Sequence, residues 1–252
     1  MRQIKYENYI KPLKVIIALL ILAILALYAF NFSTLVSYHK ASSSIKENEK
    51  LLAESIAKRK LTLKTGLMKF DPFLADLEVA LANVDPGKVS AFVSIDGDKI
   101  GKLRAERGTP CASHLVECLC AYMKDKVGSQ KDALLCGVGE VSDEILFFLP
   151  NRESEKEIID FMDELLAGWK NVTVKFEGQE IKATFSAGVA FCPKYGTNAR
   201  KLYEVAEVAL HASKQNGRDR YTVYDDTLPE QLKQQAEQEK AEQPTEQNQE
   251  KK

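Results

Sequence analysis

Residues 89–98 read VSAFVSIDGD, an apolar run that ends on two aspartates separated by one glycine. A second stretch, residues 143–150, reads DEILFFLP and carries its acids before the apolar run. Both runs are short, rich in β-branched or aromatic residues and bounded by turn residues, which predicts two strands. If the two strands are neighbours, Asp96, Asp98, Asp143 and Glu144 converge at one end of a sheet.

Carboxylates that gather in this way repel one another and are commonly held together by a divalent cation. Oxygen ligands suit Mg²⁺ or Mn²⁺, and Mg²⁺ in such sites usually carries the phosphates of a substrate. The pairing therefore predicts that the chain handles nucleoside triphosphates. Each motif also has a plain structural interpretation, because an Asp-Gly pair is a common turn and the later acids could serve only to solvate a hairpin.

The chain has 252 residues, enough for one substantial domain with appendages. Its 35 lysines and arginines nearly balance its 36 aspartates and glutamates, so long-range charge gives no reason to expect nucleic acid as a partner. The 5 cysteines are an odd number and include no C-x-x-C pair. This usage favours free thiols in a reducing cytosol over disulfides or a zinc site.

Residues 15–38 contain no charged side chain and follow a short flank at 1–14. As a helix this segment would cross a hydrocarbon core of about 30 Å. A secretory signal peptide is the alternative, but the apolar stretch exceeds an ordinary signal core of roughly 7–15 residues. Basic residues on the two sides are nearly balanced and do not orient the span. Because nucleotides and reduced thiols are cytosolic, we expect a single-pass protein of the inner (cytoplasmic) membrane with its C-terminal domain in the cytosol.

Residues 39–60 are polar, charged and free of proline and glycine, which predicts a helical stalk. Leu52, Ile56 and Leu63 have near-heptad spacing, although Arg59 interrupts the stripe. A coiled coil and a plain helical stalk both fit this pattern, and we expect a homodimer.

The remaining chain alternates helical and strand patterns, which predicts an α/β layered domain over residues 61–226. The expected helices cover residues 71–83 (with Asp71 as the N-cap), 111–126, 153–169 and 199–215. The expected strands cover residues 88–95, 133–136, 145–149, 172–176, 181–191 and 221–224. The tail, 227–252, is rich in glutamine, glutamate and lysine, so we expect disorder or a fraying helix there.

Three stretches carry a family likeness. Residues 184–190 read TFSAGVA, residues 206–218 read AEVALHASKQNGR, and residues 64–70 read KTGLMKF. They resemble the S-x-G-V-A strand, the A-D-x-A-L-Y-x-A-K-x-x-G-R helix and the core of the L-T-G-L-x-N-R entry motif of the GGDEF family of diguanylate cyclases. The resemblance spans roughly residues 61–226. It implies the palm-like fold of nucleotide cyclases, a mostly antiparallel central sheet flanked by helices.

The signature motif is degenerate, because residues 141–145 read VSDEI where the family has G-G-D/E-E-F. The resemblance implies that Asp143 is a metal ligand and Glu144 the adjacent catalytic acid. It also implies that Lys214 and Arg218 grip a triphosphate, and we add Lys99 to these cofactor-binding cations.

The first metal aspartate can be placed in two ways. Matching the strand without a shift puts Ser94 or Ile95 at that position, whereas the family's D-x-D on residues 96–98 makes Asp96 the catalytic ligand and Asp98 a second one. We take Asp96, because a strand end delivers it to the edge of the sheet. Residues 96–103, DGDKIGKL, also resemble a stretch of CRISPR-associated Cas10-type palm domains.

Val141 and Ser142 fill the space that two glycines leave open for a nucleotide in the family. The family's guanine-reading positions fall near Arg104 and Ser113, which do not offer the same hydrogen bonds, and no Arg-x-x-Asp motif precedes Val141. We therefore expect a membrane-anchored GGDEF-like protein that binds Mg²⁺ or Mn²⁺ with GTP or ATP, as a cyclic (di)nucleotide synthase of altered base preference. The alternatives are a catalytically inactive interaction module and a synthase closer to the CRISPR-linked palms.

Overall fold

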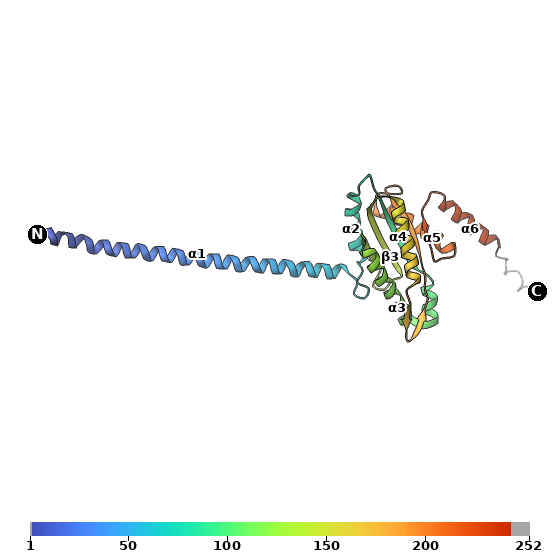
Figure 1. Ribbon diagram of the computed structural model, residues 1–252, viewed down its shortest axis with the longest axis horizontal. Coiled ribbons are helices and arrows are strands. Elements are labelled where there is room, and N and C mark those ends of the chain that lie inside the picture. The colour runs from blue at the N-terminus through green and yellow to red at the C-terminus, as the bar shows by residue number, and fades with distance from the viewer. Residues whose placement is uncertain (1, 243–252) are drawn as a thin grey trace, which may run out of the picture. The chain divides into compact units, whose positions relative to one another are not determined.

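The central sheet has five strands in the order β2-β3-β1-β6-β7. Figure 1 shows the helices that pack around it. The computed structural model describes residues 2–242, which divide between residues 59 and 60 into two units. The N-terminal unit is helical, and the C-terminal unit contains the sheet. The palm-like α/β fold expected from the sequence is confirmed.

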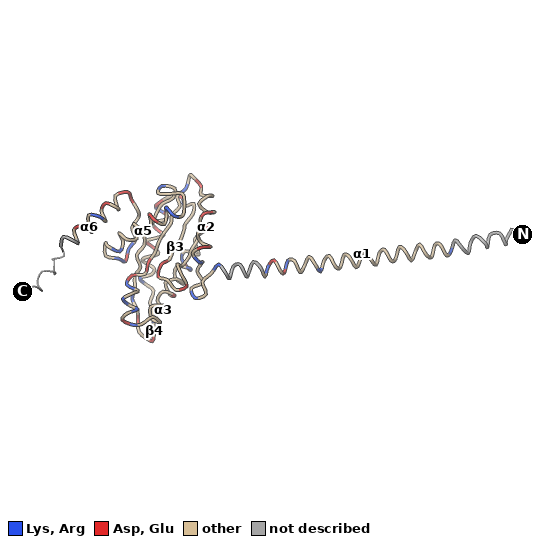
Figure 2. The backbone as a smooth tube through the Cα atoms, turned by 180° about the vertical axis from the view of Figure 1, so that it is seen from behind, with Lys and Arg blue, Asp and Glu red and all other residues tan. Residues whose placement is uncertain are grey.

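Helix α1 (Arg2–Lys60) runs without a break through the segments predicted as flank, span and stalk. Its apolar part, Lys14–Leu51, has a mean hydropathy of 2.7 and is long and apolar enough to cross a membrane. Figure 2 shows an uncharged stretch in the middle of this helix, with charges on either side. The side chains of Leu52 and Ile56, on which the predicted heptad stripe depends, lie outside the described residues.

Strand β1 (Val89–Gly97) lies at the centre of the sheet and pairs antiparallel with β3 (Glu144–Arg152) and with β6 (Phe185–Cys192). Strand β2 (Leu134–Gly137) pairs antiparallel with β3, whereas β7 (Tyr221–Val223) is parallel to β6. The neighbouring positions of the two acid-bearing strands are therefore confirmed.

Residues alternate between two buried faces along these strands, as the period of a β-strand requires. One face packs against α3 (Ile100–Gly128) and α4 (Glu155–Lys170) and includes Val93 and Phe147. The other packs against α2 (Phe70–Ala82) and α5 (Ala199–Gln215) and includes Phe92 and Phe148. Because both faces are covered, the central strands read as nearly continuous apolar runs.

Gly188 of β6 is the point where α5 lies directly on the sheet. A Cβ atom at this position would lie 2.0 Å from the carbonyl oxygen of Ala206 and 2.3 Å from the backbone nitrogen of Leu210. The backbones of strand and helix leave no room for any other residue, which gives the glycine of the TFSAGVA stretch a packing role.

Two predicted helices differ from the structure. Helix α2 has Lys69 rather than Asp71 as its N-cap, and Asp71 lies in the first turn, where its charge favours the helix dipole. Helix α3 starts at Ile100, well before the predicted residue 111, and bends at Gly108, whose φ is 84°. A glycine tolerates this left-handed conformation, so the chain begins a second helical segment there.

The predicted strand over residues 181–191 is divided between two sheets. Strands β4 (Val174–Phe176) and β5 (Gln179–Ile181) form a separate hairpin, in which Glu177 and Gly178 both have positive φ, as a tight two-residue turn requires. In the tail, residues 228–242 form helix α6, and its Leu228 packs against α5. Residues 243–252 of the predicted tail lie outside the described residues.

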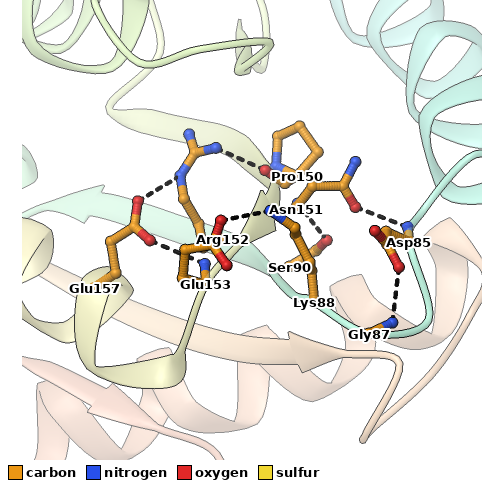
Figure 3. A network of polar contacts seen from close by, with 9 residues as sticks. All are labelled: Asp85, Gly87, Lys88, Ser90, Pro150, Asn151, Arg152, Glu153 and Glu157. Atoms are coloured by element: carbon orange, nitrogen blue, oxygen red, sulfur yellow. Dashed lines mark hydrogen bonds and ion pairs between the residues drawn. The ribbon is translucent and has the colours of Figure 1, made fainter.

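A polar network closes the end of the β1–β3 pair where β1 begins and β3 ends (Figure 3). The side-chain oxygen of Asn151 accepts a hydrogen bond from the backbone N–H of Asp85 at 2.8 Å. The backbone N–H of Asn151 donates a hydrogen bond to Ser90 Oγ at 2.9 Å. The buried guanidinium of Arg152 donates to the Pro150 carbonyl at 2.6 Å and faces Glu157 at 3.7 Å. We call these residues the closing network.

Candidate functional site

The opposite end of the β1–β3 pair brings the predicted acids together. Asp96 lies directly across from Glu144 in the antiparallel register, on the face that packs against α5. The Gly97 amide donates to the Asp143 carbonyl at 3.1 Å. A Cβ atom on Gly97 would lie 3.2 Å from that of Asp143 and 2.9 Å from the Ile100 side chain, so the glycine permits the close approach.

Lys214, in the last turn of α5, forms a salt bridge with Asp96, with 3.0 Å between Nζ and Oδ2. Both side chains are about one-third exposed, at 31% for Lys214 and 29% for Asp96. Burial raises the pKa of Asp96, and the carboxylates of Asp143 and Asp98 raise it further, whereas Lys214 opposes the rise. The lysine therefore offsets part of an excess of negative charge.

Two residues of α5 that the sequence did not single out complete this surface. Tyr203 donates its hydroxyl hydrogen to Glu144 at 3.0 Å, and Ser94 donates to Glu207 at 2.6 Å. Burial and the nearby carboxylates of Glu144 and Glu207 raise the pKa of Tyr203. The signal for both residues was their spacing of four on an amphipathic helix, which places them on one helix face.

Glu144 has a raised pKa, first because it is partly buried and then because Glu207, Asp96 and Asp143 lie nearby. The hydrogen bond from Tyr203 works in the opposite direction. We call the four carboxylates Asp96, Asp143, Glu144 and Glu207 the acidic seam.

Asp98, the second predicted metal ligand, forms hydrogen bonds within the protein. It is 6% exposed, and its carboxylate accepts hydrogen bonds from Ser186 Oγ at 2.7 Å, Thr184 Oγ1 at 2.6 Å and the Asp219 amide at 3.0 Å. Both of its oxygens are therefore occupied by the protein itself. Asp98 fastens a loop in which Arg218 and Asp219 adopt φ values of 64° and 50°, a conformation that costs energy outside glycine.

A cavity of about 550 Å³ lies beside this loop, between the start of α3, the β4–β5 hairpin and the end of α4. Its lining brings together the predicted cations Lys99 and Arg218, whereas Lys214 is not among the residues that line it. Three further lysines line the cavity: Lys102, Lys170 and Lys182.

Two of these lysines are committed, because Lys102 pairs with Glu106 at 3.6 Å and Lys170 pairs with Asp219 at 2.9 Å. Within the described part of the chain, Lys99, Lys182 and Arg218 form no salt bridge. The cavity therefore offers uncommitted positive charge, although none of the four seam carboxylates is among the residues that line it. Lys182, in the link between β5 and β6, belongs to no motif from which sequence could have found it.

The β2–β3 turn holds the residues that replace the family's glycines. Gly139 takes the positive φ, 100°, that the turn needs. Val141 packs partly buried against the core on the α3–α4 face, and Ser142 Oγ accepts the Glu144 amide hydrogen at 3.2 Å. Both side chains thus have structural contacts.

The donor set of the seam suits a hard divalent cation. Among the described residues, no three acidic, histidine or cysteine side chains form a ready-made metal cage. Mg²⁺ seldom uses such a cage, since it is usually held by one or two carboxylates together with substrate phosphates. Mutually repelling oxygen donors beside the ammonium group of Lys214 fit that mode of binding.

Comparison with known proteins agrees with the fold. The family model described as "Diguanylate cyclase, GGDEF domain" matches residues 42–220. No curated protein matches the chain.

Three solved structures illustrate the likeness. The GGDEF domain of TpbB (YfiN) from Pseudomonas aeruginosa is 17% identical with a TM-score of 0.63, covering 69% of this chain and 99% of that one. The coiled coil and GGDEF domain of DgcB from Caulobacter crescentus, in complex with c-di-GMP, gives 16% and 0.63, with coverages of 75% and 97%. The diguanylate cyclase SiaD from P. aeruginosa, in complex with its activator SiaC, gives 15% and 0.69, with coverages of 88% and 85%. At these identities the likeness concerns the fold.

Proposed function

The chain belongs to the GGDEF, diguanylate cyclase family, and from this premise we propose that its α/β unit binds a divalent cation together with a nucleoside triphosphate. The observation that carries the proposal is the opposition of Asp96 and Glu144 across β1 and β3, beside Lys214. It gives a concentration of negative charge next to a basic helix end, which is what a cation and a polyphosphate require together.

Asp96, Asp143 and Glu144 are the residues that would hold Mg²⁺ or Mn²⁺. When bound, the cation would neutralise charge on the phosphates and favour ionisation of a ribose hydroxyl. Asp98 is left out of this set, because its oxygens already accept three hydrogen bonds. Lys99, Lys214 and Arg218 would hold the phosphate chain through charge-assisted hydrogen bonds.

GTP and ATP are both candidate ligands. Arg104, near one of the family's guanine-reading positions, is exposed on α3, and Ser113 cannot replace an acidic acceptor. This supports a base preference different from that of the family. The activity to be tested is cyclic mononucleotide or dinucleotide synthesis.

We place the chain at the cytoplasmic membrane, anchored by α1, with the α/β unit in the cytosol. The apolar stretch within Lys14–Leu51 supports the anchor, and the presence of nucleotides in the cytosol supports the orientation. Pairing of two copies through the stalk is part of this proposal, and the near balance of charge gives no role to nucleic acid.

A catalytically inactive interaction module is the second candidate. It is favoured by Val141 and Ser142, whose side chains fill the turn that the family keeps open, and which make contacts of their own in the fold. In that case the acids would be relics, and the domain would act through its surfaces.

Binding of labelled GTP and ATP to the full chain in detergent, with and without Mg²⁺ or Mn²⁺, tests the first candidate. We expect metal-dependent binding of at least one nucleotide and its loss in Asp143→Asn. Failure of both nucleotides to bind would remove the proposal. A product screen with mixed nucleoside triphosphates then separates the synthase from the inactive module.

A further inference from the structure

Lys214 is placed to compete with the metal ion that the seam would hold. Of the salt bridges found among the described residues, only the Lys214–Asp96 pair involves a carboxylate of the acidic seam. The ammonium group contacts Oδ2 of Asp96, one of the oxygens proposed as a metal ligand. A divalent cation and an ammonium group on the same carboxylate repel each other, so their binding is mutually unfavourable.

The phosphates of a nucleotide would offer the ammonium group of Lys214 an alternative partner to Asp96. Lys214 lies in the last turn of α5, four residues before Arg218 of the loop that follows, and Arg218 lines the cavity together with Lys99. Its flexible four-carbon stem and its one-third exposure leave the ammonium group free to turn from a carboxylate to a phosphate.

We propose that Lys214 is the resident counter-ion of the acidic seam, which leaves Asp96 for the phosphate chain when cation and nucleotide arrive together. The inference rests on the proposed function for its second half only. Its consequence is conditional binding: the chain alone holds a divalent cation weakly, and the nucleotide makes the cation site complete. Lys214 thereby protects the site from loading with metal alone.

This assignment predicts effects of opposite sign from a single substitution. In Lys214→Gln the seam loses its internal cation, so we expect Mn²⁺ to bind the nucleotide-free chain about tenfold more tightly, a typical coupling between two sites. The same variant should bind Mn²⁺–nucleotide about tenfold less tightly, because a phosphate contact is lost. If Lys214 had only a structural role, its substitution would not raise the affinity for Mn²⁺ alone while lowering the affinity for Mn²⁺–nucleotide.

The measurement is Mn²⁺ binding to the full chain in detergent, followed by electron paramagnetic resonance, without nucleotide and with non-hydrolysable GTP and ATP analogues. Lys156→Gln is the matched control, because it removes another lysine–aspartate pair, with Asp160, on the surface of α4. It should leave both affinities unchanged. The double variant Lys214→Gln/Asp96→Asn should lose the gain in metal affinity if the gain acts through Asp96.

An unchanged or weaker nucleotide-free Mn²⁺ affinity in Lys214→Gln overturns the inference, as does a gain that survives in the double variant. This result is separable from the fate of the proposed function. A tighter metal site in a chain that binds no nucleotide would refute the proposed function while retaining the counter-ion role. If the wild-type chain binds nucleotide normally but Lys214→Gln shows no gain in Mn²⁺ affinity, the counter-ion role is refuted and the proposed function is retained.

Discussion

The two ends of the β1–β3 pair are built on opposite principles. At the closing network each polar group has a complementary partner, as between Asn151 and the Asp85 amide or between Arg152 and the Pro150 carbonyl. At the acidic seam, Asp96 and Glu144 face each other with raised pKa values. The same two strands therefore end once in satisfied hydrogen bonds and once in mutual repulsion.

This contrast distinguishes a stabilising polar cluster from one that is suited to bind. Satisfied buried networks rigidify a fold, whereas like charges held together cost energy unless something else neutralises them. A shift in register between Val89 and Ala91 separates the closing network from the regular pairing that places Asp96 opposite Glu144. The two ends therefore belong to the same pair of strands but do not share one register.

The largest effect on stability is expected from disrupting the packing of α5 against the sheet at Gly188. Gly188→Ala inserts a methyl group at 2.0 Å from the Ala206 carbonyl, so α5 must lift from β6. We expect a loss of about 3 kcal/mol or more in the free energy of unfolding, measured by denaturant titration of the full chain, since overpacking against backbone is costly. Gly101→Ala is the control, because a Cβ atom there would meet nothing within 4 Å apart from the adjoining backbone of its own helix. Equal stability of the two variants would contradict the packing role of Gly188.

A second variant acts at Asp98, a buried carboxylate that lines the cavity. In Asp98→Asn an amide group must replace an oxygen that accepts from Thr184, Ser186 or the Asp219 amide. Loss of charge-assisted bonds to a buried carboxylate should cost about 2–3 kcal/mol in unfolding free energy. Asp160→Asn, on the surface of α4, should cost far less. If Asp98 were instead only a metal ligand, its neutralisation would leave stability without metal nearly unchanged.

The closing network can be broken by itself with Arg152→Met. The carbonyls of Pro150 and Lys131 lose their guanidinium donor, and we expect a loss of about 2 kcal/mol in unfolding free energy. Metal and nucleotide affinities measured below the unfolding transition should stay within twofold of wild type. A selective loss of nucleotide affinity in this variant would show that the two ends are not separate in function.

The smallest effect concerns the repulsion within the seam. Partial burial and three carboxylates raise the pKa of Glu144 above its ordinary value of 4.5. The folded state then holds its proton to higher pH than the unfolded state, so the free energy of unfolding falls as pH rises from about 4.5 through the raised pKa. Glu144→Gln should remove this fall and be more stable at neutral pH by less than about 1 kcal/mol, because the group is partly exposed. Denaturant titrations from pH 4 to 8 test the sign, and a variant less stable at pH 7 than at pH 4.5 relative to wild type would contradict it.

The sheet and its helices were largely predictable because their signals are local. Three local signals each specify an element through nearby residues: the apolar run that begins at residue 89, the amphipathic spacing of residues 199–215 and the Glu177-Gly178 turn. The helical segment from Ile100 to the kink at Gly108 was missed, since glycine and proline at residues 108 and 110 are local signals of a helix boundary and the prediction began the helix after them. The division of residues 181–191 was missed because pairing, not propensity, separates the hairpin from the main sheet.

The candidate site was predictable in part for the same reason. Sequence order placed Asp96, Glu144 and Lys214 in one neighbourhood, and the structure brings their side chains together. The different task of Asp98 depends on Thr184, Ser186 and a loop amide, all distant in sequence. For Tyr203 the helix spacing could indicate its face but not its contact with Glu144, and Lys182 was identified only when its segment was placed in space.

The borders of the sheet have a consequence for self-association. Strand β2 has 4 residues and strand β7 has 3, so each border presents few free backbone groups to another extended chain. Short outer strands are one way in which proteins avoid uncontrolled strand addition. Two copies that meet must therefore recognise each other through helical surfaces or side chains, and lengthening β7 by design would be a route to unwanted fibrous assembly.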